Sequence, residues 1–437
     1  MRTRPTFRCG LAGLLLLAGP TRLTGETRPV MEAEITRRTE AALPKVVAWR
    51  RDLHQNPELG NRETRTAGIV AEHLRRLGME VRTGVARTGV VAVLRGGRPG
   101  PAVALRADMD ALPVTEQVDL PFASKVRTTW NAQEVGVMHA CGHDNHVAIL
   151  MGTAEVLAGM REQLPGTVTF LFQPAEEGAP RGEEGGAEVM IREGALDTPR
   201  VGAIFGLHVF TGPLGSIGYR AGGFMASGDT FRITVKGRQT HGAQPWRGVD
   251  PIVVGSQIVL GLQTIVSRQV ELPATPAVIS AGIFRSGVRS NIIPDDAYLE
   301  GTIRVFDEAI REDIHRRVRQ TAESIAAASG AAAEVEIEPG NPVTFNDPDL
   351  TRRMLPTLER VAPGKVMERP PQTVAEDFSL YQKRIPGLFV FLGVTPADQD
   401  WKTAASNHSP MFFADEGALP VGVRLLTSLA VDYLNGK

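Results

Sequence analysis

Residues 168–178 read VTFLFQPAEEG, an apolar run followed by a proline and a pair of glutamates. The run Val168–Phe172 has the composition of a strand that is buried on both faces, and Pro174 ends it. Glu176 and Glu177 therefore lie just beyond the carboxyl end of that strand, where open α/β sheets bind their ligands. The stretch predicts a buried strand with two carboxylates at a functional edge, although adjacent glutamates are more often ordinary surface charges.

Similar apolar runs occur on both sides of this stretch. They are Val90–Leu94, Ala102–Arg106, Ala203–His208 and Leu388–Val394. Segments with helical spacing of apolar residues lie among them, at 31–53, 64–78 and 146–157. This alternation predicts an α/β domain with a mostly parallel sheet.

Between about residues 224 and 338 the pattern changes. Strands are expected at Phe231–Lys236, Ala277–Phe284, Tyr298–Val305 and Glu334–Glu338, with helices at Pro251–Val270 and Glu308–Ala328. This β-α-β-β-α-β order is that of a ferredoxin-like unit. Because it interrupts the first pattern, we expect an inserted domain over 223–339, within a domain formed by 30–222 and 340–437.

The composition excludes several classes of protein. A chain of 437 residues is long enough for two or three domains. Its formal net charge of −1 provides no bulk attraction for nucleic acid or anionic membranes. We therefore expect a small-molecule partner, with no nucleic acid and no stable membrane span.

The first 25 residues carry four arginines and no acidic residue, with the apolar run LAGLLLLA at 11–18. That run is too short to span a bilayer and suits the core of a secretory signal. We expect residues 1–25 to be a signal peptide and the enzyme to be exported, periplasmic or secreted. The alternative is an apolar extension of a cytoplasmic protein. Cys9 would leave with the signal, so Cys141 would be the only cysteine of the mature chain.

Residues 138–146 read MHACGHDNH and place four candidate metal ligands close together. The spacing of Cys141 and His143 suits one zinc-like ion bound by a loop. Asp144 is expected at a helix N-cap, where its carboxylate can orient a ligand. Taken alone, the motif is equally consistent with a helix cap that carries incidental histidines.

Residues at other strand ends favour the metal site. His208 ends the run Ala203–His208, and His408 lies in the loop after the last apolar run. Asp108 and Asp110 follow Ala102–Arg106. They are expected as carboxylates that support the ligands or as a metal ligand, and a strand-end turn capped by aspartate is the equal alternative. Histidines and glutamates that follow three different strands at one edge are difficult to explain by coincidence.

Three residues of the expected inserted domain can reach a substrate. His241 follows the strand Phe231–Lys236 and can stabilise an oxyanion when the domains close. Asn291 and Arg304 lie further along, and Arg304 can pair with a substrate carboxylate, although a surface ion pair is equally common.

Eight stretches together resemble the aminoacylase and dinuclear-metal carboxypeptidase family, in the branch of hippurate hydrolases and auxin–amino-acid conjugate hydrolases. They are LRADMDALP (105–113), MHACGHDNHVA (138–148), FQPAEEG (172–178), GLHV (206–209), GRQTHGAQPW (237–246), SNIIPDDAYLEGTIR (290–304), AEDFS (375–379) and NHSP (407–410). They run in family order from about residue 40 to the end. One departure is Asn407, which stands where relatives often have an apolar residue.

The resemblance implies two divalent metal ions, of zinc, manganese, cobalt or nickel, held by Cys141, His143, Glu177, His208 and His408. It implies Glu176 as the general base and His241, from the partner subunit of a homodimer, as a stabiliser of the transition state. Asn291 and Arg304 would bind substrate from a lid and dimerisation domain. Asp108, Asp110 and Asp144 would support the ligands.

The leading hypothesis is metal-dependent hydrolysis of N-acyl amino acids, in which Glu176 takes a proton from water and later protonates the leaving nitrogen. A dipeptidase or carboxypeptidase of the same fold is the alternative. A thiol enzyme using Cys141 and His143 would leave Glu176, Glu177, His208 and His408 without a role. A binding protein with a structural metal fits less well, because structural zinc sites are closed by four ligands.

Overall fold

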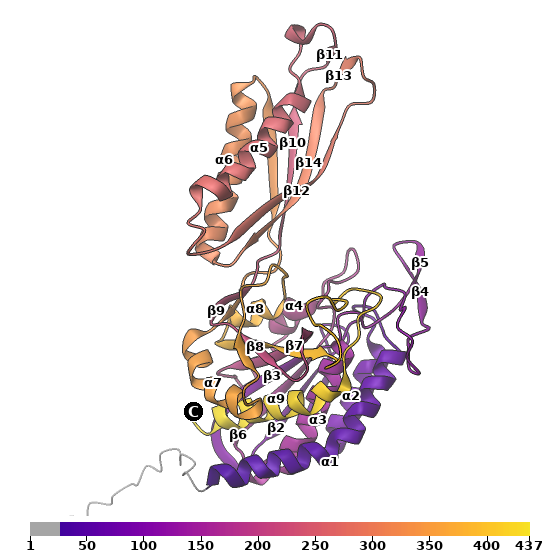
Figure 1. Ribbon diagram of the computed structural model, residues 1–437, viewed down its shortest axis with the longest axis vertical. Coiled ribbons are helices and arrows are strands. Elements are labelled where there is room, and N and C mark those ends of the chain that lie inside the picture. Colours follow the sequence, from indigo (N-terminus) through magenta and orange to yellow (C-terminus); the bar gives the residue numbers. More distant parts are fainter. Residues whose placement is uncertain (1–26) are drawn as a thin grey trace, which may run out of the picture.

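The computed structural model describes residues 27–437, which form two units joined by a narrow waist (Figure 1). The expected signal peptide, residues 1–25, lies outside the described residues. The larger unit contains an eight-stranded sheet, and the smaller one contains a four-stranded sheet. The strands and helices that were expected from the sequence in each unit are present.

The large sheet is mixed and mostly parallel at its centre. Strands β6, β3, β7 and β18 run parallel to one another, whereas β1, β2 and β8 pair antiparallel with their inner neighbours. Parallel strands bring their carboxyl ends to the same edge, which is where the candidate ligands were expected. The spatial order is β1 (Glu80–Val85), β2 (Gly89–Arg95), β6 (Pro165–Gln173), β3 (Arg98–Asp108), β7 (Ile204–Pro213), β18 (Gly387–Thr395), β8 (Ile217–Tyr219) and β17 (Val366–Glu368).

Helices cover both faces of this sheet. One face packs against five helices: α1 (Thr27–Gln55), α2 (Thr64–Arg76), α3 (His143–Gly159), α7 (Pro348–Val361) and α9 (Leu419–Leu434). The other face packs against α4 (Gly186–Arg192) and α8 (Phe378–Gln382). Since the central strands are apolar on both sides, two helical layers are needed to bury them.

The small unit is a β-α-β-β-α-β arrangement. Its antiparallel sheet has the order β12 (Ala277–Ser286), β14 (Asp296–Val305), β10 (Asp229–Lys236) and β15 (Ala332–Glu338). Helices α5 (Pro251–Gln269) and α6 (Glu308–Ala328) cover one face, and Asp250 and Asp307 cap their first turns. The strict alternation of buried and half-exposed residues along β14 shows that its other face is not covered by helices.

Short paired strands lie at the waist and at the far end of the small unit. At the waist, β9 (Gly222–Met225) pairs with β16 (Thr344–Asn346), so the chain leaves the large unit after Met225 and returns before Thr344. At the far end of the small unit, β11 (Thr240–His241) pairs with β13 (Ile292–Ile293). The hairpin β4 (Arg127–Trp130) and β5 (Gln133–Gly136) projects from the large unit (Figure 1).

Two helical segments are long and apolar enough to span a membrane by length and composition, Pro251–Gln269 and Glu416–Leu434. We expected no stable membrane span, and length and composition alone do not distinguish these two helices from spanning ones. The second segment is mostly buried in the large unit, which is sufficient to explain its apolar composition. The first packs on the small sheet through one face only, and Val253 and Leu260 on its other face are exposed.

Candidate metal centre

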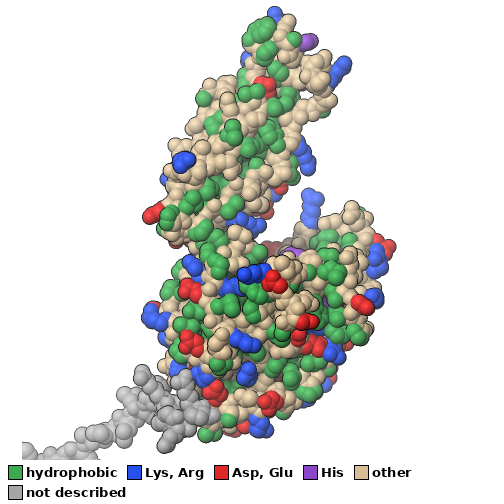
Figure 2. All heavy atoms as spheres, viewed as in Figure 1, with side chains coloured by type: hydrophobic (Ala, Val, Ile, Leu, Met, Phe, Trp, Pro, Cys, Tyr) green, Lys and Arg blue, Asp and Glu red, His purple; other side chains and the backbone are tan. Residues whose placement is uncertain are grey.

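Five proposed ligands meet between the large sheet and the hollow that separates the two units (Figure 2). Cys141 lies in the turn before α3, His143 is the first residue of α3, and Glu177 follows β6. His208 lies inside β7, which continues to Pro213 instead of ending at the histidine. His408 comes from the loop after β18. Segments distant in sequence therefore supply one cluster.

The distances place Cys141 at the centre of this cluster. Its Sγ atom lies 3.3 Å from Nε2 of His208 and 3.2 Å from Nε2 of His408. It belongs to two groups whose ligand atoms lie within 4.8 Å of one another, one with His143 and His208 and the other with Glu177 and His408. A sulfur atom shared by two groups suits two neighbouring cations, each held by one group.

The unpaired atoms of the cluster fit a metal. Both ring nitrogens of His143 are buried without a well-formed hydrogen bond, and Oε1 of Glu177 is buried with the imidazole of His408 2.9 Å away. Buried polar atoms are normally paired, so these atoms call for a ligand that supplies positive charge. Soft and borderline donors, one sulfur with three imidazoles and a carboxylate, suit the transition metals that were expected.

The charges in the cluster also favour a bound metal. Burial lowers the pKa of His143, but the charges of Asp108 and Asp110 outweigh it and raise the pKa to about 10. Burial and the charges of Glu177 and Glu176 raise the pKa of the Cys141 thiol. The cluster thus holds more negative charge than its own groups can balance, and divalent cations would balance it.

His208 is aimed by its neighbours. Its Nδ1 donates to the carbonyl oxygen of Val209 at 2.7 Å, which leaves Nε2 free to face Cys141. The N–H of Val209 donates to Nε2 of His146 at 2.8 Å, and Nδ1 of His146 binds Asp108. Both nitrogens of His146 are therefore occupied, so this histidine supports the site and is unavailable as a ligand.

Glu176 lies beside the cluster with a carboxylate that is free to act. Its Oε2 atom lies 3.9 Å from Nε2 of His143, and only a long contact of 3.4 Å joins Oε1 to the N–H of Asp377. Burial and the charge of Glu376 raise the pKa of Glu176 well above its usual range. A carboxyl group beside the ligands that is not held by a strong hydrogen bond is able to exchange a proton with a neighbouring group.

A buried ion network that the sequence did not reveal lies behind Glu176. The guanidinium of Arg106 contacts Asp108, Glu376 and Asp377, and all four side chains are buried. The available signal was an arginine at the end of an apolar strand, which is rarely tolerated without acidic partners. Glu376 and Asp377, which match the AEDFS motif, therefore support the site by pairing with Arg106.

The three aspartates lie around the cluster at different distances. Asp110 approaches Nδ1 of His143 to 3.3 Å, and its other oxygen accepts the N–H of Glu177. Asp108 is 3.7 Å from the same nitrogen of His143. Asp144 turns away and binds His54 of α1 at 2.8 Å. Gly142, not Asp144, occupies the N-cap of α3 because the turn there requires a φ of 91°, so that expectation was wrong.

The substrate residues expected from the small unit are far apart. His241 and Asn291 lie at its far tip, beside the β11–β13 pair, and both are exposed (Figure 1). His241 therefore does not reach the cluster of its own chain in this structure. Arg304 lies at the opposite end, near the waist, where Nη1 makes only a 3.5 Å contact to the carbonyl of Ser227.

The cluster opens into a cavity of about 230 Å³. One wall carries the ligands and Glu176, and the other is apolar, with Phe210 stacked on Phe391 at 4.5 Å between ring centroids. Ala375 also lines the cavity, and a Cβ on Gly228 would touch both Ala375 and Arg304. Arg304 therefore lies near Ala375 at the waist, although it is not one of the residues that line the cavity.

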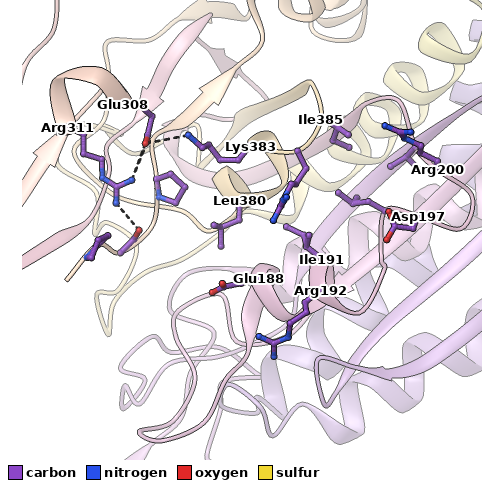
Figure 3. Close-up of a pocket in the computed structure, with 16 residues that line it drawn as sticks. Glu188, Ile191, Arg192, Asp197, Arg200, Glu308, Arg311, Leu380, Lys383 and Ile385 are labelled. Atoms are coloured by element: carbon purple, nitrogen blue, oxygen red, sulfur yellow. Dashed lines mark hydrogen bonds and ion pairs between the residues drawn. The ribbon is translucent and has the colours of Figure 1, made fainter. Parts of the chain in front are cut away.

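A larger groove of about 950 Å³ lies at the waist between α4, α8 and the start of α6 (Figure 3). Glu308 of the small unit lies there between Arg311 and Lys383 (Figure 3). Its ion pair of 3.6 Å with Lys383, which belongs to the large unit, joins the two units. None of the candidate metal-binding groups among residues 27–437 includes a residue that lines it. The smaller cavity is therefore the candidate active site.

Comparisons with known proteins agree with this geometry. The family model described as peptidase family M20/M25/M40 matches residues 104–432. The chain is 41% identical over 393 residues to thermostable carboxypeptidase 2 of Saccharolobus solfataricus, covering 89% of this chain and 95% of that protein. It is 40% identical over 393 residues to the N-acetylcysteine deacetylase of Bacillus subtilis, covering 89% and 97%.

A solved structure extends the similarity to three dimensions. The crystal structure of the Bacillus subtilis YXEP protein, described as a dinuclear metal binding peptidase from the M20 family, superposes with a TM-score of 0.76. The two chains are 38% identical, and the match covers 90% of this chain and 99% of the other. The likeness therefore includes both the large and the small unit.

Proposed function

Because the chain belongs to peptidase family M20/M25/M40 and is a metal-dependent hydrolase, we propose that it hydrolyses the amide bond of N-acyl amino acids or related small amides. The alternative is a dipeptidase or carboxypeptidase of the same fold. The deacetylase and the carboxypeptidase among its relatives support the two readings respectively. Both activities cleave a linear amide and differ in what occupies the acyl side.

One observation carries the proposal: a half-buried carboxylate, Glu176, lies beside five converging ligands at the wall of a cavity. Two bound divalent ions, of zinc, manganese, cobalt or nickel, would polarise the amide carbonyl and acidify a water molecule. Glu176 would accept the proton of that water and later pass it to the leaving nitrogen. The products are a carboxylic acid and an amine.

The remaining residues would bind and orient the substrate. Arg304 lies near Ala375 of the cavity wall, and no acidic partner is found for its guanidinium among residues 27–437, so it suits the carboxylate of an amino acid. His241 and Asn291 would act on the active site of a second subunit, since both lie at the tip of the small unit. Nδ1 of His241 accepts the N–H of Ala243, so its Nε2 is available to donate to an oxyanion.

A homodimer joined through the small unit would place these residues. The outer face of α5 carries exposed apolar side chains, among them Val253 and Leu260, which are 53% and 70% exposed. A helix that exposes such residues is suited to association. We further propose 223–339 as the lid and dimerisation domain, 30–222 and 340–437 as the catalytic domain, and residues 1–25 as a signal for export.

The thiol-enzyme alternative is disfavoured by the surroundings of Cys141. The side chain is buried and its pKa is raised, whereas a nucleophilic thiol needs a lowered pKa and access to substrate. The neighbouring carboxylates disfavour the thiolate that such a mechanism requires. The same carboxylates are what a metal centre needs.

Elemental analysis of the purified full-length protein, combined with a hydrolysis screen, tests the proposal. The screen sets N-acetyl and N-benzoyl amino acids against a panel of dipeptides, before and after removal of metal with a chelator. We expect about two metal equivalents per chain and amide hydrolysis that returns when divalent metal is restored. Tightly bound metal without hydrolysis of either panel would instead support a binding protein.

A further inference from the structure

Asn407, the residue before His408, joins three segments of the metal centre. Its Nδ2 donates to the carbonyl oxygen of Cys141 at 2.9 Å and to that of Val209 at 3.0 Å. Two carbonyl acceptors fix the orientation of the amide, because only the NH₂ end can donate to both. The loop after β18 is thereby attached to the turn before α3 and to β7.

Both carbonyl groups lie in the backbone that carries metal ligands. The first belongs to Cys141 itself. The second belongs to Val209 and also accepts Nδ1 of His208, which fixes the ring so that Nε2 faces Cys141. The Asn407 side chain therefore holds the backbone that carries two ligands, Cys141 and His208. Asn407 is also the residue before a third ligand, His408.

The backbone of His408 shows why such support is needed. Its φ is 70°, a left-handed conformation that a residue with a Cβ rarely adopts and that costs about 1–3 kcal/mol. The N–H of His408 donates to the carbonyl of Ala140 at 2.8 Å. Besides the contact between the His408 ring and Cys141 Sγ, this bond and the two bonds of Asn407 join residues 407–408 to the turn before α3 and to β7.

We propose that Asn407 is a positioning residue that sets the separation of Cys141, His208 and His408 and so fixes the geometry of the metal pair. The inference rests on the proposed function for the identity of the ligand, and on contacts within this chain for the role of Asn407. An apolar residue of similar size would fill the space but supply neither hydrogen bond. The backbone of His408 would then relax, and the ligands would separate.

The test measures Zn²⁺ and Mn²⁺ affinity by competition with a chromophoric chelator, using N407D and N407L. N407D keeps the shape and loses both donors, and N407L removes polarity as well. Loss of a residue that orients metal ligands typically weakens affinity about 10–100-fold, and we expect a loss in this range. N407S, which keeps one donor, should lie between wild type and N407D.

Asn346 provides a matched control in the same unit. Its Nδ2 also donates to two carbonyl oxygens, those of Arg220 at 2.9 Å and Phe389 at 2.8 Å. N346D should lower the melting temperature and leave metal affinity at the wild-type value. A purely structural role of Asn407 would give N407D this same behaviour and would overturn the proposal.

Hydrogen exchange of the metal-free protein separates this inference from the proposed function. In N407D and N407L, the amide of His408 should lose protection relative to wild type. Wild-type protein that binds no metal would refute the proposed function, and the exchange experiment would still decide whether Asn407 holds the loop. Unchanged protection at His408 together with unchanged affinity would refute the positioning role.

Discussion

Nε2 of His408 lies 2.9 Å from Oε1 of Glu177, although the two side chains come from segments far apart in the chain. Both also belong to one candidate metal-binding group with Cys141, so the pair can interact directly without metal and share a cation when metal is bound. Glu177 follows β6 in the first half of the chain, and His408 follows β18 near its end. The close approach therefore depends on the parallel strands at the centre of the large sheet.

Replacing Glu176 with glutamine should abolish most turnover and leave metal binding unchanged. The amide keeps the size of the side chain but cannot accept the proton from water, and loss of a general base typically costs about 10²–10⁴-fold in rate. Steady-state kinetics and elemental analysis of E176Q measure the two effects. E184Q is a control, because Glu184 is exposed and pairs with Arg192 at the surface. Near-normal activity of E176Q would refute the assignment of the base.

Much of this site was predictable from the sequence, because strand ends in a parallel sheet meet at one edge. That rule predicts Glu177, His208 and His408 at one edge of the sheet, although His208 lies inside β7 and His408 in a loop after β18, and the family resemblance supplied the ligand set. The rule gives no information on the residues that lie behind Glu176. The ion network of Arg106 arises from tertiary burial of charge, and no local pattern specifies which acids pair with it.

The position of the tip of the small unit could not be predicted from the sequence either. The motif around His241 was recognisable, but its distance from the cluster depends on the length of β10 and on the orientation of the waist. Likewise, β8 and β17 were missed because strands of three residues carry too little pattern to be recognised. Long periodic elements, such as α6 and β14, were predicted at almost their observed bounds.

Activity should be restored when two inactive variants are mixed, if His241 acts on the partner subunit. H241A and E176Q should each be inactive alone. After subunit exchange in a twofold dimer, about a quarter of the active sites would carry both native residues, so about a quarter of wild-type activity should return. H315A is a control, because His315 lies on α6 and pairs with Asp229 away from the tip. Absence of recovery in verified mixed dimers would show that His241 does not act across subunits.

Replacing Arg304 with alanine should weaken binding of substrates that carry a free carboxylate. A charge-assisted hydrogen bond contributes about 1.5–3 kcal/mol, so KM for an N-acyl amino acid should rise by about 10–100-fold with little change in kcat. The corresponding N-acyl amino acid amide, which lacks the negative charge, should show little difference between the two proteins. An equal rise in KM for both substrates would indicate that Arg304 acts by supporting the waist instead.

Stability at low pH should depend on Asp229 at the waist. This carboxylate binds Arg311 and His315, which together outweigh burial and lower its pKa from 3.8 to about 2. Because the folded-state pKa lies below the unfolded one, the stabilisation is complete above about pH 4 and is lost as the pH falls toward 2. The shift corresponds to about 2 kcal/mol in the free energy of unfolding. Denaturant titrations at several pH values measure it, and D229N should flatten this part of the profile.

Two ion pairs at the waist, one buried and one exposed, can be compared directly. D229N leaves the guanidinium of Arg311 without its buried partner and should cost about 3–5 kcal/mol at neutral pH. K383A removes only the exposed ion pair with Glu308 and should cost about 1 kcal/mol or less, decreasing further in high salt. Urea unfolding of the two variants at low and high salt measures both effects. Equal costs would mean that the waist is held by the exposed pair as much as by Asp229, contrary to the difference in burial.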